Sequence, residues 1–162
     1  MTVRLADTPD IAAVAALHRD AFPRQMDSVA WVSATLAASP RLLAYVLEQD
    51  QAVAGYVFWA QKSGIRPAAV LEIEQIVVSA RMQGIGLGER LIRESLSLVA
   101  ARLRANGQSV RSILVSTRAD NRAQRIYARV LGARVVAEVE DLYSATEVFM
   151  VADLVDVRGI GV

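Results

Sequence analysis

An apolar strand, a glycine-rich turn and a long amphipathic helix follow one another in the middle of this sequence, and this succession constrains the fold most. The strand is expected over Val70–Val78, where VLEIEQIVV alternates at first and ends fully apolar. Its last residues should therefore be covered on both faces of a sheet. The turn, RMQGIGLG, occupies residues 81–88, and the helix after it carries one apolar stripe: Ile92, Leu96, Val99 and Leu103. A strand joined to a helix in this way predicts an α/β fold.

The flanking patterns extend this prediction to the whole chain. Alternation, proline and glycine stops and helical periodicity predict a strand, two helices, three strands, a helix, a strand, a helix and two strands. We therefore expect an α/β fold (an α+β mixed sheet) of about seven strands, with helices on both faces. The remaining expected elements are strands at 1–6, 41–48, 53–60, 109–116, 134–139 and 147–155, and helices at 8–21, 27–38 and 121–131. Residues 157–162 are expected to fray.

Length and composition exclude several classes of protein. The 162 residues suit one domain, 1–162, and 54% hydrophobic residues with 22% charged residues argue against disorder. A net charge of +1 does not favour nucleic-acid or membrane binding. No apolar run is long enough for a membrane span, so we expect a cytoplasmic protein. The chain has no cysteine and one histidine, His18, which is more often structural than catalytic, so no metal site is predicted.

The glycine-rich turn has the composition of a phosphate-binding site. Gly84, Gly86 and Gly88 stand at alternate positions, where the missing Cβ atoms let backbone N–H groups approach a ligand, and the helix behind them adds its positive end. Tight packing alone is the alternative reading. A P-loop would continue with Lys and then Ser or Thr, whereas Glu89-Arg90 follow here, and a dinucleotide fingerprint would need Gly or Ala at Glu89. These residues favour a pyrophosphate-binding site that is neither a P-loop nor a dinucleotide-binding fingerprint.

Two linked motifs resemble those of one enzyme family. The pattern Arg81-x-x-Gly84-x-Gly86, between a strand and a helix, resembles the coenzyme A motif of the GNAT superfamily of acetyl-CoA dependent N-acetyltransferases. A second family motif is matched after an intervening strand by Asn121, Ala123, Tyr127 and Gly132, although Ala133 replaces a frequent aromatic residue. The resemblance covers essentially the whole chain. It implies the GNAT fold, with a mostly antiparallel mixed sheet, and transfer of an acetyl group from acetyl-CoA to a primary amine.

The resemblance also implies roles for individual residues. Glu72 would be the base that deprotonates the amine, with Glu74 as second choice. A bulge in the strand would exchange the orientations of their side chains. In the alternative interpretation, both glutamates simply lie on a solvated face of the strand. Tyr127 would donate a proton to the departing thiolate, or pack in the core instead. Asn121 would bind the pantetheine arm or cap a helix. The expected coenzyme A contacts are Ile76, Val77, Val78, Arg81, Met82, Gln83, Gly84, Ile85, Gly86, Leu87, Gly88, Asn121 and Arg125.

The acceptor is the part of the function on which the sequence says least. The aromatic residues Phe22, Trp31 and Tyr56 are candidates for its pocket and equally for the core. No serine or histidine pattern predicts an activated nucleophile, which favours direct transfer in a ternary complex. A non-catalytic acyl-CoA sensor of the same fold is the alternative function. The acceptor amine, small molecule or peptide, stays open, and a homodimer paired through the final strand is possible.

Overall fold

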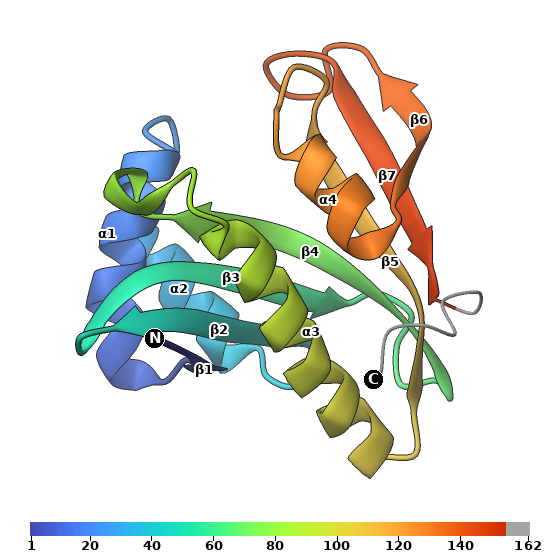
Figure 1. The fold of residues 1–162 in the computed structure, drawn as a ribbon, viewed down its shortest axis with the longest axis horizontal. Coiled ribbons are helices and arrows are strands. Elements are labelled where there is room, and N and C mark those ends of the chain that lie inside the picture. Colours follow the sequence, from blue (N-terminus) through green and yellow to red (C-terminus); the bar gives the residue numbers. More distant parts are fainter. Residues whose placement is uncertain (155–162) are drawn as a thin grey trace. The chain divides into compact units, whose positions relative to one another are not determined.

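The computed structural model describes residues 1–154 and contains the predicted elements in the predicted order (Figure 1). The predicted fraying of residues 157–162 and the end of the strand predicted at 147–155 lie outside the described residues. The elements are β1 (Thr2–Leu5), η1 (Thr8–Asp10), α1 (Ile11–Ala21), α2 (Ser28–Ala37), β2 (Leu42–Gln49), β3 (Ala52–Gln61), β4 (Ala68–Val78), η2 (Ala80–Met82), α3 (Leu87–Ala105), β5 (Ser109–Arg118), α4 (Gln124–Leu131), β6 (Arg134–Val139) and β7 (Glu147–Asp153).

The strands form one seven-stranded mixed sheet in the order β1-β2-β3-β4-β5-β7-β6. The neighbours β1–β2, β2–β3, β5–β7 and β6–β7 pair antiparallel, whereas β4 and β5 run parallel, as the helix between them requires. The predicted fold class is confirmed. One detail was wrong: the final strand has no free edge, because β7 pairs with β5 on one side and β6 on the other. The edge strand of this end of the sheet is β6.

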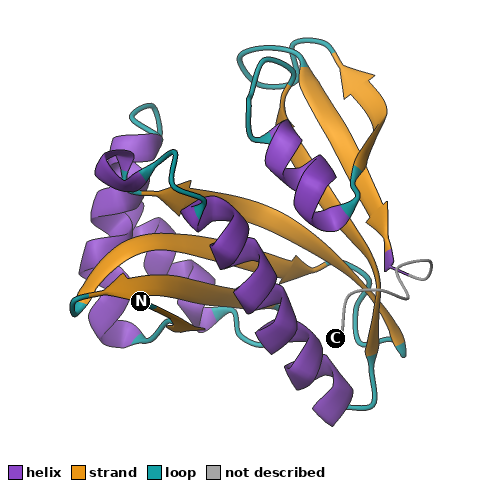
Figure 2. Ribbon diagram, in the orientation of Figure 1, coloured by secondary structure: helices purple, strands orange, loops and turns teal. Residues whose placement is uncertain are grey.

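The chain divides into two compact units, which we describe separately. Among the described residues, the first contains 1–60 and 75–96, and the second contains 61–74 and 97–154. Strand β4 and helix α3 each contribute residues to both units. Figure 2 distinguishes the helices, strands and connecting loops of each.

In the first unit, helices cover both faces of the strands. Tyr56 and Phe58 of β3 point to one face and form a core cluster with Val14 of α1 and Val32 of α2. Trp59 points to the opposite face, because successive side chains alternate along a strand, and its indole N–H donates to Ser95 of α3 at 2.9 Å. All six residues are at most 1% exposed. The expected helices on both faces are thus present within this unit.

In the second unit, α4 contacts β5, and the apolar side of α4 is buried. The buried residues are Tyr127, Val130 and Leu131, which recur at helical spacing. The helix ends at Gly132, whose φ of 69° is a left-handed conformation that glycine adopts without strain. This is the predicted stop signal, and it places Tyr127 in the middle of a short, well-defined helix.

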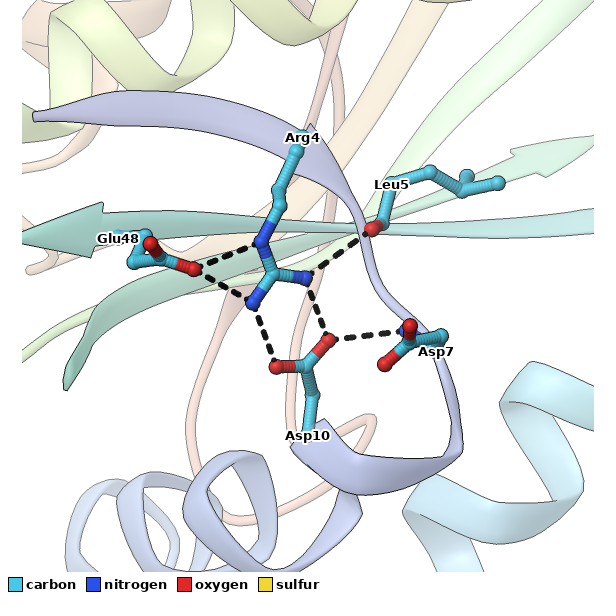
Figure 3. A network of polar contacts seen from close by, with 5 residues as sticks. All are labelled: Arg4, Leu5, Asp7, Asp10 and Glu48. Atoms are coloured by element: carbon cyan, nitrogen blue, oxygen red, sulfur yellow. Dashed lines mark hydrogen bonds and ion pairs between the residues drawn. The ribbon is translucent and has the colours of Figure 1, made fainter. Parts of the chain in front are cut away.

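Arg4 connects three elements of the first unit (Figure 3). Its guanidinium group donates to both carboxylate oxygens of Asp10 in η1, at 2.7 and 2.9 Å, and its Nε donates to Glu48 of β2 at 2.8 Å. The Asp10 side chain is only 7% exposed, and it also accepts a hydrogen bond from the Asp7 backbone N–H. The hydrogen bonds from Arg4 hold the pKa of Asp10 below its ordinary value. This network fixes the start of α1 against β1 and β2.

Replacing Arg4 with methionine is expected to lower the free energy of unfolding by about 2–3 kcal/mol at neutral pH, because Asp10 remains a buried carboxylate without its cation. The folded-state pKa of Asp10 lies below 3.8, so its stabilising contribution is complete above that pH and is lost as the pH falls further. The difference between the wild type and the variant should therefore shrink in acid. Urea unfolding at neutral pH and below pH 3.8 measures it, with exposed Arg41→Met as control. An equal loss at both pH values would contradict this account.

Candidate active site

The glycine-rich turn of the first unit has an open backbone in a conformation that favours glycine. Gly84 and Gly86 have φ values of 83° and 85°, which L residues with a Cβ rarely adopt, and a Cβ at either position would meet no atom within 4 Å. Both residues and Ile85 between them are exposed. The side-chain amide of Gln83 donates to the Val78 carbonyl at 3.0 Å, which ties the turn to the end of β4. No packing contact requires glycine at these two positions. Their positive φ values are the reason that glycine is needed there.

Helix α3 begins directly behind this turn, with Leu87 buried and the Gly86 carbonyl accepting from the Arg90 N–H at 3.1 Å. The first N–H groups of a helix have no partner within it, and they carry the positive end of its dipole. An exposed glycine backbone followed by a helix N-terminus offers N–H donors and a positive dipole end to an anionic group such as a phosphate. The expected contacts Ile76, Val77 and Val78 lie at the adjoining end of β4, and Arg81 is exposed beside the turn.

Replacing Gly86 with alanine is expected to cost about 1–2 kcal/mol of stability, because alanine would be strained at this φ. The same change at Gly107, which has a φ of 71° and equally open surroundings, should cost about as much. If the turn binds coenzyme A, only Gly86→Ala should also reduce the rise in melting temperature caused by that ligand. Equal ligand-induced shifts in the two variants would remove the turn from the binding site.

The two glutamates of β4 belong to the second unit and lie on one side of the strand. Leu71 and Ile73 are buried, whereas Glu72 and Glu74 alternate with them and are more exposed. The register irregularity of β4 lies between Ala69 and Val70, ahead of both glutamates, so it does not separate them. The Glu72 side chain is 14% exposed, and its Oε2 lies 3.0 Å from Nζ of Lys62. The roles predicted for these glutamates stay predictions.

Tyr127 lies on the buried side of α4 and is 5% exposed. Burial raises the pKa of its phenol to about 12, because the charged phenolate would lose its hydration. The hydroxyl group is therefore protonated at every physiological pH. A protonated hydroxyl group suits the predicted role as a donor to the thiolate. The burial of Tyr127 is equally expected if the residue only packs in the core.

Asn121 uses both ends of its side-chain amide within its own segment. Its Oδ1 accepts from the Ala123 backbone N–H at 2.9 Å, and its Nδ2 donates to Thr117 at 2.8 Å. These contacts stabilise the turn before α4, whose N-cap residue is Ala123, and α4 has no side-chain cap hydrogen bond. One N–H of the Nδ2 group remains as a possible donor to a ligand. Arg125, the other contact expected from this region, is exposed on α4.

The three aromatic residues predicted near the acceptor differ in exposure. Tyr56 is fully buried in the core cluster of the first unit, with its hydroxyl 3.4 Å from Oε1 of Gln75. Burial raises the pKa of Tyr56 above its ordinary value. Phe22 packs partly buried against the same cluster, and Trp31 is 43% exposed on α2. Of the three, Trp31 presents the most surface to an acceptor.

The family comparison matches most of these elements. A model described as the acetyltransferase (GNAT) family matches residues 11–133, about three quarters of the chain. The chain belongs to the GNAT acetyltransferase family. The matched range includes the glycine-rich turn, both glutamates of β4 and Tyr127. The prediction that the chain is an acetyltransferase is thereby confirmed, and the alternative of a non-catalytic sensor is not supported.

Solved structures of GNAT enzymes share the fold. An aminoglycoside 6'-N-acetyltransferase from Enterococcus faecium is 16% identical with a TM-score of 0.77, covering 95% of this chain and 97% of that one. A ribosomal-protein-alanine N-acetyltransferase from Brucella melitensis is 19% identical (TM-score 0.73, 95% and 100% covered). NAA60 from Arabidopsis thaliana in complex with acetyl-CoA is 16% identical (TM-score 0.74, 94% and 98% covered). No curated protein matches the chain by sequence.

The sequence did not predict two contacts of this GNAT chain. His18 is fully buried, with Nδ1 2.9 Å from Oγ of Ser28, so it joins α1 to α2. Burial lowers the pKa of His18 because the charged imidazolium is disfavoured. The second contact is that of Lys62 with Glu72. Lys62 could have been singled out from the composition, because it is the only lysine of the sequence. Only a structure reveals which residue each contacts.

Two features are absent from residues 1–154. None of the helices there is both long and apolar enough to span a bilayer. The same residues contain no group of three or more His, Cys, Asp or Glu side chains arranged to hold a metal ion.

Proposed function

We propose that this GNAT enzyme transfers the acetyl group of acetyl-CoA to a primary amine by direct attack, with Glu72 as base and Tyr127 as hydrogen-bond donor to the leaving sulfur. The observation that carries the proposal is the exposed Gly84–Gly86 backbone, held in left-handed conformations immediately before α3. It lies within the range matched to the family. Acetyl-CoA supplies the activated acyl group.

The base is needed because an alkylammonium ion has a pKa near 10 and must lose a proton before its nitrogen can attack. Glu72 supports this role through its low exposure and through its contact with an ammonium group, that of Lys62. A carboxylate that already accepts an ammonium donor has the geometry to accept one from a substrate. Glu74 remains the second candidate.

Tyr127 acts on the other side of the reaction. A coenzyme A thiol ionises near pH 8.5, whereas burial raises the pKa of Tyr127 to about 12. Complete proton transfer from Tyr127 to the thiolate would therefore be uphill by roughly 5 kcal/mol. The hydroxyl stabilises the developing negative charge on sulfur by a hydrogen bond, and solvent supplies the final proton.

The acceptor is proposed only as a primary amine of a small molecule or peptide. The related structures include enzymes named for aminoglycosides and for a ribosomal-protein alanine. We propose that Trp31 and Phe22 line the acceptor pocket. Tyr56, which is fully buried, would support these residues from the core of the first unit. We further propose that the chain forms a single domain and that the enzyme is cytoplasmic. A homodimer would use the β6 edge in place of the final strand.

The test is the melting temperature of the full chain with and without excess acetyl-CoA, with ATP and NAD as controls. Ligand at about a hundred times its dissociation constant adds ~2.7 kcal/mol of apparent stability. We expect a rise with acetyl-CoA alone, followed by amine-dependent release of free thiol when a panel of amines is added. No shift with acetyl-CoA, or a shift only with ATP or NAD, would overturn the proposed coenzyme site.

A further inference from the structure

Lys62 is the only lysine in the sequence, and the other seventeen basic residues are arginine. It follows β3 directly, and its ammonium nitrogen lies 3.0 Å from Oε2 of Glu72, the proposed base. The Lys62 side chain is 49% exposed, whereas that of Glu72 is 14% exposed. The one primary amine among the side chains thus contacts the one carboxylate that the proposed reaction uses to deprotonate an amine.

The backbone holds this pair in place. The Lys62 N–H donates to the Val70 carbonyl at 2.9 Å, and the Val70 N–H donates to Oγ of Ser63 at 2.9 Å. The side-chain amide of Gln61 donates to the Gly64 carbonyl at 2.8 Å, which closes the turn. Glu72 lies two residues beyond Val70 and hence on the same face of the strand. The contact between Lys62 and Glu72 follows from this local pairing.

The choice of lysine at this position has a chemical meaning. Arginine forms the better ion pair with a carboxylate, because its planar fork can donate two parallel hydrogen bonds. It cannot lose its proton, however, and so cannot become a nucleophile. A position that served only to pair with Glu72 would be at least as well filled by arginine, the basic residue used everywhere else in this chain. Lysine adds the capacity to react.

We propose that Lys62 is itself an acetyl acceptor of this enzyme, modified within the same molecule; this inference rests on the proposed function. Glu72 takes one proton from the Lys62 ammonium group, and the free amine attacks the acetyl carbon of acetyl-CoA. A C–N bond forms, the C–S bond breaks, the nitrogen loses its second proton to solvent, and solvent protonates the departing thiolate. The products are Nε-acetyl-lysine and free coenzyme A, and Glu72 releases its proton to solvent.

The modification changes the site that produces it. An acetylated lysine is neutral and no longer pairs with a carboxylate. Glu72 is then free of its internal partner and available to an incoming ammonium group. Lys62 thereby acts as a built-in competitor of the external amine until it is acetylated.

The test is the mass of the intact full-length chain after incubation with acetyl-CoA, followed by peptide mapping. We expect one added acetyl group on Lys62, with a rate constant independent of protein concentration. Glu72→Gln should slow this modification about ten-fold or more, since it removes the base. The matched control combines Lys62→Arg with Arg66→Lys, which moves the single lysine to an exposed position in the same loop and should stay unmodified.

A measurement without acetyl-CoA tests the contact itself. With ¹³C-labelled lysine the apo protein gives one ε-methylene NMR signal, and Glu72→Gln should shift it, whereas Glu138→Gln on exposed β6 should not. An unmoved signal would overturn the inference. So would equal acetylation of the relocated lysine, a rate constant that increases with protein concentration, or an unmodified Lys62. If acetyl-CoA raises the melting temperature while Lys62 stays unmodified, the inference fails and the proposed function stands; without that rise, the proposed function fails.

Discussion

Tyr127→Phe is expected to lower the turnover number about ten-fold or more while leaving the affinity for coenzyme A nearly unchanged. The substitution keeps the buried ring and removes only the hydroxyl group, so helix α4 should keep its packing. The lost interaction is the hydrogen bond to the leaving sulfur, which is strongest when charge develops on that atom. Thiol release with a reactive amine measures turnover, and the acetyl-CoA-induced melting shift measures binding.

The control for this variant is Tyr143→Phe, the same chemical change at a side chain that is 77% exposed. It should leave both turnover and binding at wild-type values. If Tyr127→Phe retains full turnover, Tyr127 has no part in the chemistry and its burial is the packing of an ordinary core tyrosine. A loss of binding together with turnover would instead place the hydroxyl group in the ground-state complex.

Glu72→Gln is expected to reduce turnover at neutral pH about ten-fold or more, because the amide cannot accept the proton of the substrate ammonium group. Its pH profile should differ in shape from that of the wild type. The rise in rate should move to higher pH, toward the range in which the free amine forms without help. Thiol release measured across neutral and alkaline pH, with one fixed amine, gives this profile.

Two companion variants make the assignment of the base specific. Glu74→Gln removes the second candidate on the same face of β4, and Glu138→Gln makes the same change on exposed β6. The proposal requires the altered profile in Glu72→Gln alone. A wild-type profile in Glu72→Gln together with an altered one in Glu74→Gln would transfer the role to Glu74.

The element order was predictable because each signal acts within a few residues. The left-handed Gly132 ends α4, as the sequence pattern indicates, and α3 extends to Ala105 and so contains the whole predicted apolar stripe up to Leu103. The helix predicted to start at residue 121 starts at Gln124 instead. The side chain of Asn121 bonds to the Ala123 N–H and holds the preceding turn. Asn121 therefore stabilises the turn before α4 and does not cap the helix, whose N-cap is Ala123.

The candidate site was predictable where it depends on residue types in fixed spacing. The Arg81-x-x-Gly84-x-Gly86 pattern led to the family, and the structure gives both glycines left-handed φ values. The acceptor side was less predictable. An aromatic residue such as Tyr56 suits a core and a pocket equally well, and its burial depends on which helices pack over it.

By itself the sequence determined the chemistry that the chain can offer: a glycine backbone for phosphates, carboxylates on β4, a tyrosine on α4 and one lysine. These depend on residue identity and on spacing within one element. Only the tertiary structure decided the pairings between elements, such as Arg4 with Asp10 and Glu48, and Lys62 with Glu72. It also decided that β7 is an inner strand and β6 an edge. Strand order depends on contacts between residues far apart in the sequence, and each ion pair depends on how its two segments pack, which no pattern within one element specifies.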